Sequence, residues 1–176
     1  MIRLMWTKSN KPLSKLIRWI FNEPCSHFAI VFDDRFLFQS NLKGAHPTFF
    51  NWFLSENEIV HELVFRTPVY IEEAIWDKIT SRFNKPKPYD YGAFFYLGIR
   101  GLGHKWFGFP LPTKNLWGDR DYYMCLELAQ CLDLIIRVPA NLDALTPQQL
   151  WLTTKPLNWC VEVSTRGTHD DTNSST

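Results

Sequence analysis

One apolar stripe constrains how the second half of this chain can fold. After Cys125, apolar side chains recur at Leu128, Cys131, Leu132 and Ile135. These positions follow the i, i+3, i+4, i+7 spacing of one buried helix face. The spacing predicts a helix that begins near Cys125 and ends near residues 138–139, where a proline follows a valine.

The position of Cys125 in the first turn of this predicted helix has a chemical consequence. Asp119 or Asp121 is a plausible N-cap. The positive end of a helix dipole favours a thiolate, which is the nucleophilic form of cysteine. A cysteine nucleophile needs a base, and His27 is a candidate because it lies in a stretch that predicts a β-strand.

The remaining pattern alternates strands with helices and predicts an α+β fold. Strands are expected at residues 2–6, 26–32, 35–40, 58–65 and 158–164, and helices at 13–21, 72–83, 91–99 and just after Thr146. Asp33 and Asp34 lie between two of the strands and favour a hairpin. A loop is expected around Gly44 and Pro47, and the aromatic residues 49–53 fit either a short helix or a hydrophobic clamp. We expect one domain over residues 1–164 and a flexible polar tail over 165–176.

Residues 89–118 have an unusual composition. They contain six of the eight glycines, interleaved with tyrosine, phenylalanine and tryptophan. Beyond the helix expected at 91–99, this segment predicts a long loop, and long loops in compact domains are often functional. Residues 104–117 are therefore candidates for holding an acyl chain, or for contacting a membrane surface or another protein.

Composition and charge exclude several classes of function. The net charge of +1 gives no general case for nucleic-acid binding. No apolar run approaches the ~20 residues of a membrane span, and the N-terminal residues lack a signal-peptide core. We expect a protein made in the cytosol, whose four cysteines remain reduced.

Simpler interpretations stay open beside the catalytic one. Cys125 is also compatible with a buried helix cysteine and His27 with a core histidine, since buried cysteine is common. A metal site would use Cys25 and His27, which alternation places on one strand face. No third ligand in a recognisable motif accompanies them, so neither a metal nor a cofactor is expected.

Four stretches, taken in chain order, carry a family resemblance. They are Ser14-Lys15-Leu16-Ile17-Arg18-Trp19 leading into Ser26-His27-Phe28-Ala29-Ile30, then Tyr89-Asp90-Tyr91-Gly92, then Tyr123-Met124-Cys125-Leu126-Glu127-Leu128, and finally Leu145-Thr146-Pro147-Gln148-Gln149-Leu150 before a last strand. Together they resemble the circularly permuted branch of the NlpC-type papain-like superfamily. This branch includes cell-wall amidases and endopeptidases, and relatives of lecithin:retinol acyltransferase.

The resemblance implies an antiparallel sheet packed against the N-terminal helix and the Cys125 helix. It also implies a nucleophile at Cys125, a general base at His27 and an orienting residue at Gln39, with His46 as the alternative. Where the family usually has a small residue after the cysteine this chain has Leu126, and where it often has histidine or glutamate it has Gln39. Separately, Asp90 is expected to cap a helix rather than to take part in chemistry.

The expected function is that of a thiol hydrolase that cleaves amide bonds through an acyl-enzyme, with bacterial cell-wall peptide as the substrate implied by resemblance. Tyr89, Tyr91 and Trp106 are candidates for substrate or oxyanion contacts. One alternative is a lipid or thioester acyl hydrolase or transferase of the same fold. Another is a weakly catalytic partner-binding module. A bacteriophage structural or lysis-associated protein, carried in the virion or delivered to the cell envelope, would fit the lack of a signal peptide.

Overall fold

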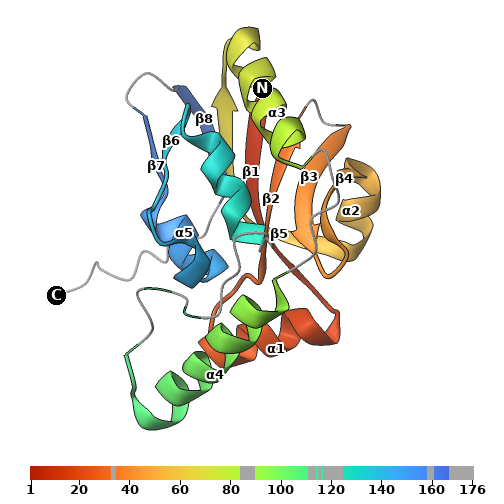
Figure 1. The fold of residues 1–176 in the computed structure, drawn as a ribbon. Helices are drawn as coiled ribbons and strands as arrows, with labels where there is room; N and C mark the ends of the chain where they lie inside the picture. Colours follow the sequence, from red (N-terminus) through yellow and green to blue (C-terminus); the bar gives the residue numbers. More distant parts are fainter. Residues whose placement is uncertain are drawn as a thin grey trace, which may run out of the picture.

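The computed structural model describes residues 1–32, 35–83, 90–110, 114, 116, 125–157 and 161–166. Figure 1 shows a twisted sheet with helices on both faces and a pair of helices beyond one end. The main sheet consists of β1 (Ile2–Ser9), β2 (His27–Phe32), β3 (Phe36–Asn41), β4 (Gly44–Phe49), β5 (Asn57–Arg66) and β8 (Val161–Arg166). The helices are α1 (Pro12–Phe21), α2 (Phe50–Glu56), α3 (Val69–Arg82), α4 (Tyr91–Phe107), α5 (Pro147–Thr153) and the 3₁₀ helices η1 (Cys125–Leu132) and η2 (Leu142–Ala144).

The strands are antiparallel throughout the main sheet, in the order β4-β3-β2-β1-β5-β8. Two short strands, β6 (Ile136–Arg137) and β7 (Lys155–Pro156), form a separate ribbon. The α+β class expected from the sequence is confirmed. The predicted hairpin is also confirmed, because β2 pairs with β3.

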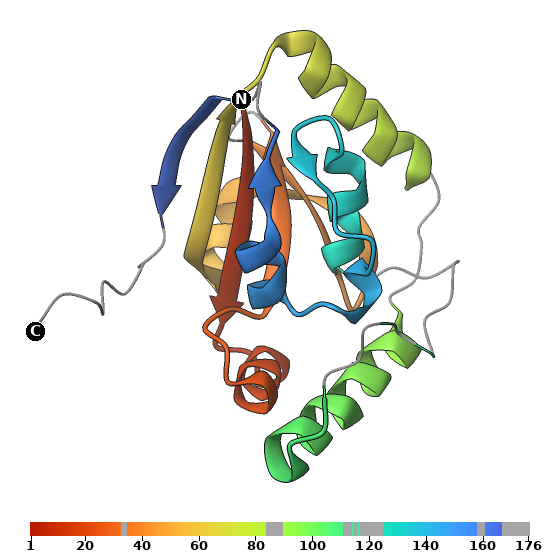
Figure 2. The same ribbon diagram turned by 90° about the vertical axis from the view of Figure 1, so that its left-hand side faces the viewer.

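The sheet separates two hydrophobic cores. Alternate residues of β2 point to opposite faces, so that Phe28 and Ile30 join the larger core with η1, α3 and α5. Ala29 and Val31 join the smaller core under α2, which includes Phe53. Figure 2 shows α2 behind the sheet and α3, α5 and η1 in front of it. The strands nearest the centre are therefore buried on both sides.

Helix α1 begins at Pro12, where a missing N–H costs nothing, and it packs mainly against α4 beyond the end of the sheet. The two helices approach closely at Gly101. A β-carbon added there would lie 2.6 Å from Ile20 Cγ2 and 2.7 Å from Phe21 Cε1. The N-terminal helix thus packs at the edge of the domain rather than across a face of the sheet, which the resemblance did not anticipate.

Helix α5 begins as the sequence predicts. Thr146 accepts a hydrogen bond from the backbone N–H of Gln149, and the Gln149 side chain accepts one from the N–H of Thr146. This reciprocal capping satisfies two backbone donors at the helix start.

The helix at Cys125 differs from the prediction. It is a 3₁₀ helix that ends at Leu132, and β6 follows within a few residues. A 3₁₀ helix has three residues per turn, and burial in η1 repeats with that period. Two adjacent rows are buried (Cys125, Leu128 and Cys131, and Leu126, Ala129 and Leu132), whereas Glu127 and Gln130 are partly exposed. The tighter helix buries two rows where an α-helix would bury one stripe. The N-cap candidates Asp119 and Asp121 lie outside the described residues.

Three predicted boundaries also change. Helix α4 continues to Phe107 instead of ending near residue 99, because its glycines permit close contact with α1 and do not break the helix. Residues 44–49 form strand β4 and not a loop. Strand β8 extends to Arg166 and includes two residues assigned to the tail. The short-helix alternative at residues 49–53 is confirmed as α2.

We expect Gly101→Ala to destabilise the protein by ~1–3 kcal/mol, because the added methyl group overlaps Ile20 and Phe21. Gly98→Ala in the same helix is the matched control, since nothing lies within 4 Å of its added carbon. That substitution should stabilise the protein by roughly 0.5–1 kcal/mol. Urea unfolding of both variants measures the difference. Equal effects from the two alanines would contradict the close packing of α1 on α4.

Candidate active site

Three polar side chains, one each from β2, β3 and β4, are linked by hydrogen bonds on the α2 face of the sheet. His27 Nε2 lies 3.0 Å from Gln39 Oε1, and Gln39 Nε2 donates to Thr48 Oγ1 at 2.9 Å. We call His27, Gln39 and Thr48 the polar relay. The predicted proximity of His27 and Gln39 is present in the structure. Thr48 was missed, because its place opposite the hairpin depends on β4, which was predicted to be a loop.

The amide orientation of Gln39 assigns the tautomer of His27. An amide oxygen can only accept a hydrogen bond, so with this amide orientation Nε2 of His27 carries the proton. In the same orientation the Gln39 NH₂ group donates to Thr48. The lone pair of the imidazole is therefore on Nδ1, which is the atom that can accept a proton.

His46 lies beside the polar relay but is not part of it. It is the register partner of Gln39 on β4, and its Nδ1 contacts Gly44 O at 2.9 Å. The prediction that His46 lies in a loop beyond the hairpin is wrong. Gln39, and not His46, contacts the imidazole of His27.

Burial keeps the His27 imidazole neutral. Desolvation is the largest cause that lowers the pKa of His27, to about 4. The hydrogen bond to Gln39 opposes this shift, whereas the charges of His46 and Lys11 add to it. At neutral pH His27 is a base with a free lone pair.

Cys125 is the first residue of η1 and is 8% exposed. Burial raises the pKa of its thiol to about 11, and the nearby Glu127 adds to the rise. Backbone groups of Phe28, Cys125 and Leu126 lower this pKa but do not compensate. Burial therefore opposes the thiolate expected at the helix start, because the cost of desolvating the anion exceeds the favourable field of the backbone.

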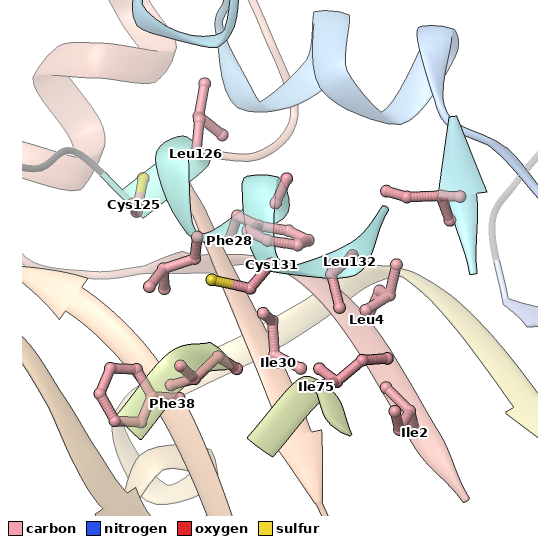
Figure 3. Packing of buried hydrophobic residues seen from close by; sticks show 14 of the residues in the cluster. Ile2, Leu4, Phe28, Ile30, Phe38, Ile75, Cys125, Leu126, Cys131 and Leu132 are labelled. Carbon is pink, nitrogen blue, oxygen red and sulfur yellow. The ribbon is translucent and has the colours of Figure 1, made fainter. Parts of the chain in front are cut away.

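The side chains of Cys125 and His27 lie on opposite faces of the sheet, near the same end of β2. The thiol interacts with the backbone of Phe28, the residue after His27, and belongs to the core that contains Phe28. Figure 3 shows Cys125 at the edge of that cluster, whereas Cys131 points into it. The His27 ring lies on the opposite face, with its centroid 6.1 Å from that of Phe53. Because His27 is the first residue of β2, the two side chains share one end of the strand.

A cavity of about 50 Å³ adjoins Cys125 and Leu126. Most of the lining is apolar, and most of it comes from α1, α4 and the start of α5. The other lining residues are Ile17, Ile20, Phe21, Ser26, Phe94, Leu97, Gly98, Leu145, Thr146 and Pro147. Leu126 is itself buried in the core and forms part of this wall. The thiol thus borders a largely apolar cavity.

A second polar cluster was not anticipated. Gln148 Oε1 accepts from Cys25 Sγ at 3.4 Å and lies 2.9 Å from His61 Nε2. The His61 ring stacks on Trp151, with centroids 4.5 Å apart. Burial raises the pKa of Cys25, so this thiol is protonated and serves as a hydrogen-bond donor that joins α5 to the sheet.

These hydrogen bonds also show that Cys25 and His27, which were considered as metal ligands, do not face a common site. Cys25 turns toward Gln148 and His27 toward Gln39, because Cys25 precedes the regular alternation of β2. Within the residues that the structure describes, no three His, Cys, Asp or Glu side chains are grouped as metal ligands.

The remaining candidates lie apart from the thiol or outside the described residues. Trp106 is 61% exposed and contacts Trp19; along α4 it lies roughly 13 Å beyond Leu97, which lines the cavity. Its assignment to substrate or oxyanion contacts is not supported by this position. The hydroxyl of Tyr91 donates to Leu42 O at 3.0 Å, and Tyr89 is outside the described residues. Asp90 caps α4 as predicted, accepting from Ala93 N at 2.7 Å.

Comparison with other proteins adds no assignment. No protein-family model, curated protein or solved structure is significantly similar to this chain. Over the described part of the chain, no helix has both the length and the apolarity needed to cross a membrane.

We expect the alkylation of Cys125 by iodoacetamide to be slow at pH 7 and to accelerate as the pH rises toward 11. The thiolate fraction at neutral pH is roughly 100-fold smaller than that of a solvent-exposed thiol when the pKa is near 11. Peptide mass spectrometry separates Cys125 from the other cysteines, and Cys125→Ser supplies the blank. Rapid alkylation of the folded protein at pH 7 would contradict a neutral resting thiol.

Proposed function

We propose that this chain is a cysteine hydrolase of the circularly permuted papain-like type, which cleaves amide bonds through an acyl-enzyme. The observation that carries the proposal is the polar relay. It holds the imidazole of His27 at the first residue of β2, and the thiol of Cys125 interacts with the backbone of the next residue, Phe28. The proposal requires the two side chains, which lie on opposite faces of the sheet, to meet around this end of the strand. A nucleophile, a base and a residue that orients the base are the parts that such catalysis needs.

In the proposed mechanism both partners begin neutral. As Cys125 Sγ attacks the substrate carbonyl carbon, the thiol proton passes to His27 Nδ1 and the carbonyl oxygen gains the negative charge. Backbone N–H groups at the start of η1 would stabilise that oxygen. The protonated imidazole then gives its proton to the leaving amine, and the C–N bond breaks. Water, deprotonated by His27, hydrolyses the thioester and restores the thiol.

A neutral Gln39 suits this order of events. An amide oxygen orients the imidazole but stabilises its charged form less than a carboxylate would. The low pKa of His27 has the same consequence. The imidazolium would therefore exist only during proton transfer, and a permanent ion pair with Cys125 is not required.

We expect Cys125→Ala to abolish amide hydrolysis and His27→Ala to reduce kcat by about 10²–10⁴-fold, the usual contribution of a general base. Thr48→Val removes only the tether on Gln39 and should cost about tenfold or less. Cys131→Ala, a buried cysteine in the same helix, is the matched control and should keep its activity. The assay uses cell-wall peptides, with circular dichroism to verify folding.

Full activity in either Cys125→Ala or His27→Ala would reject the mechanism. Absence of activity in the wild-type chain on both cell-wall peptides and acyl thioesters would favour a partner-binding role for the same fold.

A second candidate, acyl thioester or lipid ester hydrolysis, is favoured by the apolar cavity beside Cys125. An apolar chain is a better occupant for such walls than a polar peptide. The resemblance to acyltransferases agrees with this alternative, and both candidates use the same thiol.

Filling the cavity distinguishes the two substrates. The cavity volume of about 50 Å³ is well below the ~300–1,000 Å³ of ligand pockets, so it would hold only the first carbons of an acyl chain. We expect Leu97→Phe to reduce hydrolysis of butyryl and longer acyl thioesters at least tenfold if those carbons occupy the cavity, because the added ring removes much of the space. Thioesters shorter than butyryl are the internal control and should be cleaved at the wild-type rate. An equal loss on both chain lengths would indicate general damage and would exclude the cavity as an acyl site.

A further inference from the structure

The outer surface of the α1–α4 pair is apolar although it is exposed. We call it the α1–α4 face. It consists of exposed Phe95, Ile99, Trp106 and Phe107 on α4, Phe109 just after it, and Trp19 of α1, whose ring contacts Trp106. Soluble monomers seldom expose so many large apolar side chains together, and such patches mark contact surfaces.

Helix α4 has two apolar stripes on opposite sides. Ala93, Leu97 and Gly101 follow one another at i, i+4 and i+8 and are buried, and Gly101 meets α1. Phe95 and Ile99 lie about half a turn away, on a stripe that continues toward Trp106 and is exposed. Packing within the domain accounts for the first stripe only. The second has no covering element among the described residues.

The charges of these helices all have one sign. Lys15 and Arg18 lie on α1, and Arg100 and Lys105 on α4, while neither helix contains an aspartate or a glutamate. The Lys105 ammonium lies 3.8 Å from the centroid of the Trp19 ring and also donates to Trp19 O. Lys105 thus lies against an exposed aromatic ring, whereas Arg18 and Arg100 donate to Ser9 O and Pro110 O. The basic charge is concentrated on these helices although the whole chain has a net charge of only +1.

We propose that the α1–α4 face docks on the surface of an anionic lipid bilayer. Tryptophan and phenylalanine rings favour the boundary between headgroups and acyl chains, and lysine and arginine next to them attract anionic headgroups. Long basic side chains can keep their charge in the headgroup layer while their stems cover apolar surface.

A second copy of this chain is a poorer occupant. Docking two α1–α4 faces on one another would bring their cations together without carboxylates to balance them. The geometry also suits a flat surface, because α1 and α4 lie together at one extremity of the domain in both views (Figures 1 and 2). This proposal does not depend on the proposed hydrolase activity.

Co-sedimentation with vesicles tests the proposal. We expect the full chain to bind vesicles of phosphatidylcholine mixed with phosphatidylglycerol, to bind vesicles of phosphatidylcholine alone at least tenfold more weakly, and to dissociate as NaCl is added. The variant Lys15→Glu/Lys105→Glu should lose binding at least tenfold, since each basic residue near the surface contributes about 1 kcal/mol. Arg66→Glu/Lys155→Glu, which changes two exposed basic residues on β5 and β7, is the control and should retain binding.

A matched pair of tryptophan variants tests the contribution of the aromatic rings to vesicle binding. Trp106→Ala should weaken binding, whereas Trp52→Ala on α2, where the tryptophan is 54% exposed, should not. Circular dichroism verifies that each variant is folded. The proposal is overturned if the anionic vesicles do not bind the wild-type chain, if control and test variants lose binding equally, or if light scattering shows a dimer that Trp106→Ala dissociates while vesicles remain unbound.

Discussion

The structure depends on the burial of β1 and β2 from both sides. Strand β1 pairs with β2 on one edge and β5 on the other, so its backbone hydrogen bonds are satisfied within the sheet. Its side chains divide between the two cores: Leu4 and Trp6 enter the larger, and Met5 enters the smaller. With helices on both faces, the centre of the sheet excludes water, and any polar group there must find a partner within the protein.

This exclusion of water decides the chemistry of the candidate site. A partly buried imidazole and a buried thiol both favour their neutral forms, which is why the pKa of His27 falls and that of Cys125 rises. The polar relay satisfies the hydrogen-bonding capacity that burial would otherwise leave unmet. The irregularity in the pairing of β1 with β5 falls at Thr7, which is the register partner of His27. Bulges are common next to active sites, and this one coincides with the end of β2 where the thiol approaches.

Much of this arrangement could be predicted from local patterns. Residues that favour strands, with the turn at Asp33 and Asp34, identified β2 and β3, and the cross-strand distance then brought Gln39 near His27. Proline and threonine signals located the start of α5. The wrong predictions have a common origin, since each depended on a contact distant in sequence. Glycines in α4 appear as helix breakers until α1 is seen packed on Gly101. His46 was predicted in a loop because β4 forms only by pairing with β3. The dipole argument for Cys125 considered the helix alone and omitted the burial that opposes it.

The alternation of β2 has a consequence for how the sequence can vary. Neighbouring residues of this strand belong to different cores, so inserting or deleting one residue within it would exchange the two faces. Phe28 and Ile30 would then enter the smaller core, and the histidine side chain would turn from Gln39 toward the larger one. Substitutions can accumulate one side chain at a time, but a change in the length of β2 would alter both cores and the polar relay at once. Length changes in related chains should therefore be confined to the connections between strands.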